Sequence, residues 1–109
     1  MAIAVTTKRG KQQFAGAFGE LWEVYCTGCD FGNAATGSGT FASIDVTVPG
    51  VALGDMLLGV SVGVDTVDAV IYGAVTAANT LTLTLLNNTA GAVDLASTTC
   101  RFLVGRPSW

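Results

Sequence analysis

The sequence has no histidine and few charged residues. Asp, Glu, Lys and Arg together make up 12% of the chain, and histidine is absent altogether. The missing imidazole removes the usual general base, the commonest metal ligand and the side chain that titrates nearest neutral pH. Ordinary soluble domains carry about a quarter charged residues. The shortfall predicts either a surface built from Thr, Asn, Ser and Gly or, as we favour, a surface partly covered by other chains.

The sequence also lacks a recognisable membrane segment and a secretory signal. No charged side chain lies between Asp68 and Asp94, but threonines and asparagines interrupt this stretch. A spanning helix needs about 20 predominantly apolar residues. At the N-terminus, the charges follow a short apolar start instead of preceding an apolar region. We therefore expect a soluble protein, made in the cytoplasm of its host, with no membrane partner.

The basic residues are concentrated near the N-terminus. The formal net charge is −3, yet three of the five Lys and Arg residues, Lys8, Arg9 and Lys11, lie within four positions. Residues 1–19 show no sustained helical or strand period, which predicts an extended N-terminal arm before a body that covers residues 20–109. A short basic arm without a basic face is weak evidence for nucleic-acid binding. We expect the arm to dock on an acidic protein surface and expect no nucleic-acid partner.

The body alternates between apolar and other residues with the period of β-strands. In TLTLTLL, Leu81, Leu83 and Leu85 alternate with threonines, and ELWEVYC places Trp22 on the face opposite Tyr25. Similar runs, separated by turn residues, give six strands, and the arm or a neighbouring chain can supply a seventh. The pattern predicts an all-β fold: a small antiparallel β-sandwich or partly closed barrel of about six to seven strands.

Two of the expected strands have unusual faces. In DAVIYGAV, Val70 and Tyr72 lie opposite a face that is already apolar, which predicts a strand covered on both sides. Since one small core cannot cover both faces, we expect Val70 and Tyr72 to contact another copy of the chain. In DMLLGVSVGV, alternation places Leu58 with the following valines on one face, and the other, mostly small face carries Leu57, Gly59, Ser61 and Gly63.

The sequence offers little for catalysis or metal binding. Cys26 and Cys29 form a CxxC motif, and Cys100 is the third cysteine. Glycine-rich sequence follows the motif in place of a helix, and a zinc site would lack a fourth ligand. Reduced structural cysteines are therefore favoured, with a disulfide, or a metal or redox site, as alternatives. The carboxylates are scattered, so we expect structural roles for them, no catalytic site, no cofactor and no enzymatic activity.

Aromatic residues divide into two groups. Trp22, Tyr25, Tyr72 and Phe102 are predicted to lie mainly in the core, as most aromatic residues of small β domains do, with stacking on sugars or bases as the alternative. Trp109 follows GRPS as the last residue given, where its own fold cannot easily bury it. We expect Trp109 to anchor in a pocket on a partner.

The region from Pro49 to Pro107 resembles a β module of tailed-phage virion proteins. The resemblance rests on VTVPGVALGD, on the hairpin and loop VIYGAVTAANTLTLTLLNNTAGAVD, and on the closing strand TTCRFLVGRP. It implies a structural role on the particle, as a capsid decoration or cement protein, a head fibre or a fibre tip. The short chain, the basic arm and the β body favour a decoration protein.

These observations lead to one functional expectation and one alternative. We expect a non-enzymatic cement protein on the outer capsid surface of a virion, where it bridges capsomers as a homo-oligomer, with a trimer favoured and a dimer as the alternative. The arm is expected to bind the major capsid protein through Lys8, Arg9, Lys11, Phe14 and Phe18. The alternative is a fibre or receptor-binding tip that recognises carbohydrate through Trp22 or Tyr25.

Overall fold

The computed structural model describes residues 3–10, 18–31, 33–34, 40–66, 68–87, 91 and 93–107. Within these residues all regular structure is β, as the alternation predicted. The strands are β1 (Ala4–Gly10), β2 (Phe18–Cys29), β3 (Asn33–Ala34), β4 (Thr40–Thr47), β5 (Met56–Val62), β6 (Val70–Ala77), β7 (Thr80–Asn87), β8 (Val93–Asp94) and β9 (Thr98–Pro107). In this described part of the chain, no helix is long and apolar enough to span a bilayer.

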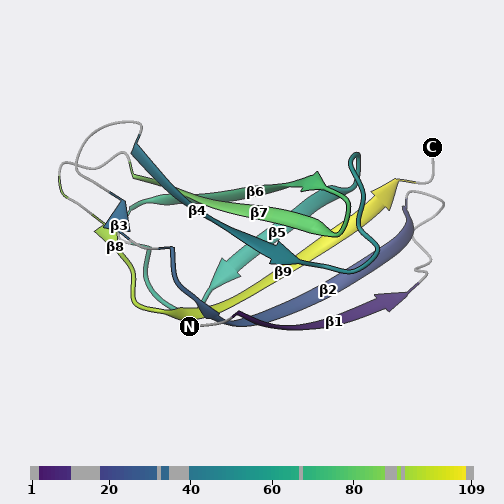
Figure 1. The fold of residues 1–109 in the computed structure, drawn as a ribbon, viewed down its shortest axis with the longest axis horizontal. Helices are drawn as coiled ribbons and strands as arrows, with labels where there is room; N and C mark the ends of the chain where they lie inside the picture. The colour runs from purple at the N-terminus through teal and green to yellow at the C-terminus, as the bar shows by residue number, and fades with distance from the viewer. Residues whose placement is uncertain are drawn as a thin grey trace.

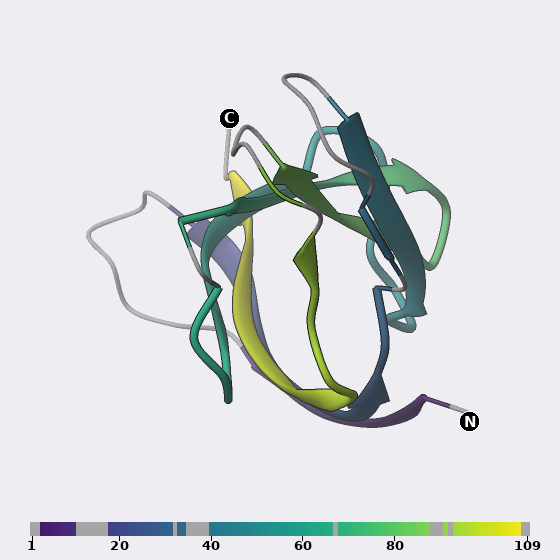
Figure 2. The same cartoon turned by 90° about the vertical axis from the view of Figure 1, so that its left-hand side faces the viewer.

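Two antiparallel sheets face each other across the core (Figure 1). The large sheet has the order β1-β2-β9-β5, and the small sheet has the order β4-β7-β6. The short strands β3 and β8 pair with each other. Figure 2 shows β2 and β9 curving around one side of the core, with the small sheet opposite. Neither sheet closes on itself, so the predicted β-sandwich is confirmed.

The core is built from alternate residues of the long strands. Leu81, Leu83 and Leu85 of β7 are fully buried, as their alternation with threonine predicted. Trp22 and Val104 meet them from the large sheet and are also fully buried. The threonines between the leucines lie on the opposite face of β7, which also carries Leu86.

Part of the segment expected to be an arm forms an edge strand. β1 pairs with β2 over its whole length, from Ala4 opposite Thr27 to Gly10 opposite Leu21. It supplies the seventh long strand from the chain's own N-terminal segment. Ile3 and Val5 pack against the core, while Lys8 and Arg9 are exposed. Charged residues on an edge strand discourage unwanted pairing with other strands.

A β-bulge in β5 overturns the expected faces of that strand. The pairing of β5 with β9 shifts between Leu57 and Gly59, so that Leu57 faces Val104 and Gly59 faces Leu103. Leu57 consequently packs against the core, and Leu58 is exposed. The extra residue reverses the alternation at this point. The prediction that Leu58 shares a face with the valines was therefore wrong.

The crossing from β4 to β5 is held to the turn between β6 and β7. Asn79 occupies this turn with φ 61°, a left-handed conformation that asparagine tolerates. Its side-chain oxygen accepts a hydrogen bond from the Gly50 N–H at 2.8 Å. Its backbone N–H donates to the Val51 carbonyl at 2.8 Å, and its carbonyl accepts from the Val48 N–H at 2.9 Å. The turn predicted at TAAN is confirmed, and it fixes the loop that joins the two sheets.

Arg9, Trp22, Asp55 and Arg106 form a cluster, here called the arginine clamp, at this end of the sandwich. The guanidinium carbons of Arg9 and Arg106 lie 4.8 Å and 5.1 Å from the Trp22 ring centroid. The Trp22 Nε1 donates to the Pro49 carbonyl at 3.1 Å, which satisfies the buried indole N–H. Arg9 also pairs with Glu20. The clamp therefore joins β1, β2 and β9 to the crossing loop.

Arg106 and Asp55 make the strongest polar contact of the clamp. Nε and Nη2 of Arg106 donate to the two carboxylate oxygens of Asp55 at 2.9 Å each, and Nη2 also donates to the Gly50 carbonyl at 2.9 Å. The Asp55 side chain is 4% exposed. Burial alone would raise its pKa, but the hydrogen bonds from Arg106 and from the Ala52 N–H hold the pKa of Asp55 below its ordinary value. Asp55 is therefore ionised at neutral pH.

Replacing Asp55 with alanine is expected to destabilise the fold. Asp55→Ala leaves the Arg106 guanidinium without its bidentate partner and releases the crossing loop. Loss of hydrogen bonds to a charged, largely buried partner costs about 2 kcal/mol or more in unfolding free energy. Urea unfolding measures this difference. Asp45→Ala is the control, because Asp45 is exposed and accepts a single hydrogen bond from Thr82, at 2.7 Å. An equal loss in both variants would contradict the clamp.

The Asp55 contribution also has a defined pH dependence. Because the folded-state pKa of Asp55 is lowered, its stabilisation is present above the unfolded-state value and disappears as the pH falls through the folded-state value. The difference in unfolding free energy between the native protein and Asp55→Ala should be constant from about pH 5 to 7 and shrink below about pH 4. A difference that grows on acidification would contradict this assignment.

Candidate functional site

The residues expected to bind a partner through the arm have separate positions in the fold. Lys8 is exposed on the outer face of β1, whereas Arg9 belongs to the arginine clamp. Phe18 begins β2 and is half-buried; a side chain at Gly105 would collide with its ring. Lys11 and Phe14 lie outside the described residues. Of the five, Lys8 alone is both described and free of the clamp and of close internal packing.

Val70 and Tyr72 lie on the outer face of the small sheet, where the sequence predicted an interface. Each is 52% exposed. The expectation that Tyr72 lies mainly in the core was therefore wrong, while its placement opposite an apolar inner face is confirmed. Trp109, the third residue expected at a partner interface, lies outside the described residues.

Two further residues extend this outer face into an apolar patch. The register places Phe41, Leu86 and Val70 side by side across β4, β7 and β6. The next row contains Ser43, Thr84 and Tyr72. Phe41 is 66% exposed, more than either predicted interface residue. We call Phe41, Val70, Tyr72 and Leu86 the apolar patch.

The other end of the same face is polar. Thr82 Oγ1 donates to Asp45 Oδ1 at 2.7 Å and lies 2.8 Å from Thr76 Oγ1. These side chains satisfy one another and remain exposed to water or half-buried. The apolar patch is therefore confined to one end of the small sheet.

A groove of about 560 Å³ crosses the outer face of the large sheet. The outward side chains that line it come from all four strands: Thr6 and Lys8 from β1, Glu23 and Tyr25 from β2, Arg101 and Leu103 from β9, and Leu58 and Ser61 from β5. The register brings Thr6, Tyr25, Arg101 and Ser61 into one row across the sheet. Lys8, Glu23, Leu103 and Gly59 form the next row.

Tyr25 and Arg101 occupy the middle of the groove. The Arg101 guanidinium carbon lies 5.0 Å from the Tyr25 ring centroid. Tyr25 is 37% exposed, so its expected core position was wrong. Trp22 and Phe102 are buried as predicted. Of the two residues expected to recognise carbohydrate, only Tyr25 therefore reaches the surface.

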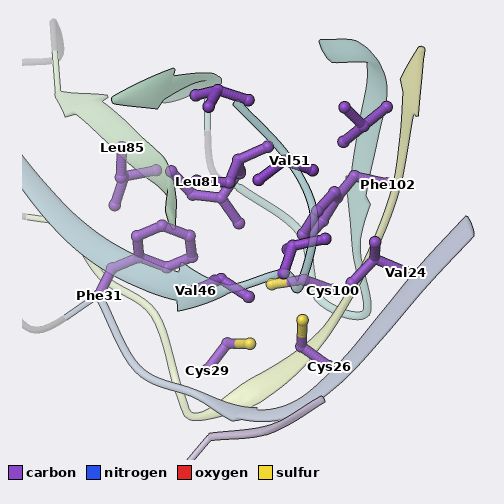
Figure 3. Close-up of a cluster of buried hydrophobic side chains, with 14 of the residues drawn as sticks. Val24, Cys26, Cys29, Phe31, Val46, Val51, Leu81, Leu85, Cys100 and Phe102 are labelled. Atoms are coloured by element: carbon purple, nitrogen blue, oxygen red, sulfur yellow. The ribbon is translucent and has the colours of Figure 1, made fainter. Parts of the chain in front are cut away.

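The three cysteines converge inside the core (Figure 3). Cys26 and Cys100 face each other across β2 and β9, and all three thiols are free and fully buried. Burial, together with the neighbouring Cys29 thiol, raises the pKa of Cys26 to about 12. The pKa of Cys100 is also raised, again mainly by burial and by contact with Cys29. The raised pKa values keep the Cys26 and Cys100 thiols protonated and unreactive, as expected of structural cysteines.

The described residues offer no site for a metal ion. Among them, no group of three or more His, Cys, Asp or Glu side chains is arranged to hold one. The functional candidates are therefore the two outer faces: the apolar patch on the small sheet and the groove on the large sheet.

Comparison with known proteins adds no relative. No protein-family model, curated protein or solved structure matches this chain. The functional argument therefore depends on its own surfaces.

Phe41 and Arg101 were not predicted as functional residues, and Tyr25 was named only for the alternative carbohydrate site while its position was expected in the core. A signal for two of them was present in the alternation. Phe41 shares the parity of Ser43 and Asp45, and Tyr25 shares that of Glu23, which marks both as outward-facing. The pairing of Tyr25 with Arg101 depends on the register of β2 with β9, which alternation does not reveal.

The buried cysteines give a direct prediction. In the folded protein at pH 8, the thiolate fraction of Cys26 should be on the order of 1 in 10,000, because its pKa is about 12. All three thiols are also fully buried, so an aromatic disulfide reagent should label the folded protein far more slowly than the same protein in denaturant, where all three cysteines react. Rapid labelling of the folded protein, at the rate of the denatured chain, would contradict this arrangement.

Proposed function

We propose that this protein is a non-enzymatic structural module that binds other protein chains, and that it acts as a decoration or cement protein on the outer surface of a phage capsid. The apolar patch is the observation that carries the proposal. The resemblance of residues 49–107 to a virion β module supports its specific form. The expected partners are further copies of the chain and the major capsid protein.

The apolar patch has the properties of a protein interface. Phe41, Val70 and Tyr72 are each more than half exposed, and they lie in neighbouring rows around Leu86. No charged residue belongs to these two rows, which begin with Phe41 and Ser43 on β4. Contiguous apolar groups on a surface mark binding sites, and aromatic side chains contribute most to such interfaces. Covering the patch removes apolar area from water at about 25 cal/mol per Å².

A second copy of the chain is the simplest cover for the patch. A homo-oligomer, with a trimer favoured over a dimer, buries the patch of every copy and presents several identical surfaces to the capsid. Individually weak contacts then combine, because attachment of one subunit raises the effective concentration of the others. Lys8, Lys11 and Phe14 remain the proposed capsid contacts of the N-terminal segment. Arg9 and Phe18 support the fold at the same time.

Oligomerisation through the patch is tested by light scattering. The native protein is expected at a multiple of the 11.1 kDa monomer mass, three times for the favoured trimer. Phe41→Ser combined with Tyr72→Ser should give a folded monomer, because both side chains contribute to the patch and neither belongs to the core. The matched control is Tyr25→Ser, which removes an exposed tyrosine from the opposite sheet and should leave the mass unchanged. A native monomer, or an oligomer that survives the double substitution, would overturn the patch as the interface.

Capsid binding is tested separately by co-sedimentation with shells assembled from the capsid protein of the same virus. The native protein should sediment with the shells. Lys8→Glu should weaken binding several-fold, because it reverses one exposed charge facing an acidic surface. A point substitution is preferable to deletion of the N-terminal segment, since deletion also removes β1 from the large sheet. A native protein that stays in the supernatant would refute the capsid role.

A further inference from the structure

The cationic side chains that have no ion-pair partner among the described residues both line the groove. The described residues include four cationic side chains, Lys8, Arg9, Arg101 and Arg106. Arg9 is paired with Glu20 and Arg106 with Asp55. Within the described ranges, Lys8 and Arg101 take part in no ion pair, and both line the groove on the outer face of the large sheet.

The groove therefore has a local charge opposite to that of the whole protein. Its lining contains two cations and one carboxylate, Glu23, which faces Lys8 across β1 and β2. The chain as a whole carries a net charge of −3. An anion is repelled by most of this surface and attracted to the groove, so the charge distribution itself favours a negatively charged ligand there.

The central cation is held ready for a carboxylate. The Arg101 guanidinium lies over the Tyr25 ring, 5.0 Å from its centroid. Stacking restrains the planar group while its N–H donors at the edge stay available. A carboxylate matches this edge with paired, charge-assisted hydrogen bonds. Lys8 lies one row away and can contribute a second, less directional contact.

The rest of the groove suits apolar side chains. Tyr25 and Leu58 are 37% and 39% exposed, and Leu103 is half-buried between Glu23 and Gly59 in its row. Gly59 has no side chain, and no atom lies within 4 Å of the position that its Cβ would occupy. The floor of the groove is therefore open at this residue. An anion that carries aliphatic or aromatic groups on either side therefore fits better than a small inorganic ion.

The dimensions of the groove match a short extended chain. It is lined by four adjacent strands, which at about 4.8 Å per spacing extend over roughly 14 Å. An extended peptide advances about 3.3 Å per residue, so four or five residues cross the groove.

We propose that the groove binds an extended acidic peptide segment of a partner protein, with a carboxylate held by Arg101 and Lys8 and the adjoining apolar side chains packed against Tyr25, Leu58 and Leu103. The groove and the apolar patch lie on opposite sheets. The inference therefore does not depend on the proposed oligomerisation, and each can fail alone.

The proposal is tested with capped, fluorescently labelled pentapeptides and the full-length protein, by fluorescence anisotropy. The probe peptide is Gly-Leu-Glu-Phe-Gly, and the comparison peptides replace its Glu with Lys or Gln. The acidic peptide is expected to bind measurably at millimolar or lower concentration, and the Lys peptide should not bind. Raising NaCl from about 50 to about 500 mM should weaken binding, because the charged contacts are exposed to solvent.

Variants of the groove separate the roles of charge and shape. Arg101→Gln should weaken binding of the acidic peptide about tenfold, and Arg101→Lys should restore part of the loss by keeping the charge without the planar fork. Tyr25→Ser should weaken binding to a similar extent, because it removes both the apolar surface and the support of Arg101. Thr47→Ala, at an exposed position of β4 outside both the apolar patch and the groove, is the control and should leave peptide affinity unchanged.

Several outcomes would overturn the proposal. The first is that the acidic peptide does not bind at concentrations up to about 5 mM. The second is that the Lys peptide binds as tightly as the acidic peptide. The third is that Arg101→Gln binds the acidic peptide with native affinity. Binding of free N-acetylglutamate as tightly as the peptide would indicate a small-anion site instead. Binding of a neutral oligosaccharide that depends on Tyr25 but not on Arg101 would indicate a carbohydrate site.

Discussion

The joining of the two sheets depends on the ion pair between Asp55 and Arg106, whose guanidinium stacks on the Trp22 ring. The crossing loop leaves the small sheet after Thr47 and enters the large sheet at Met56, so its position determines how the two sheets meet. Two parallel hydrogen bonds fix Asp55 to Arg106, and Pro49 accepts the Trp22 indole N–H. Asn79 holds the same loop from the small sheet. One loop is thereby attached to both sheets.

With this end fixed and the cysteines packed in the core, the two outer faces are left with different chemistry. The small sheet carries aromatic and aliphatic groups without charge at one end, and the large sheet carries a shallow groove with Tyr25 and Arg101 at its centre. The first face suits contact with another apolar protein surface, and the second suits a charged ligand. The chain has few charged residues overall, so the presence of two cationic side chains without an ion-pair partner in one groove sets this face apart from the rest of the described surface.

Alternation was enough to predict the strand class, the buried leucines of β7 and the position of Val70 and Tyr72 on the face opposite the inner one, because side-chain direction in a strand follows sequence parity. It failed where parity is broken, as in the bulge at Leu58, since an extra residue in one strand shows only in its pairing with the next. It also could not assemble the arginine clamp, whose members are far apart in the sequence and meet only through the sheet register. For Tyr25, the general tendency of aromatic residues to be buried was given more weight than the parity it shares with Glu23, and parity was the better guide.

The bulge in β5 places two residues of opposite sequence parity, Leu57 and Val60, on the same core-facing side. On either side of it, Leu57 and Val60 face the core, while Leu58 and Ser61 face the groove. Groove residues can therefore change without altering what the core packs against, and this holds equally for Tyr25 beside Val24 and for Arg101 beside Phe102. Substitutions on the outer face of the large sheet can in this way change what the groove recognises while the folded body stays the same.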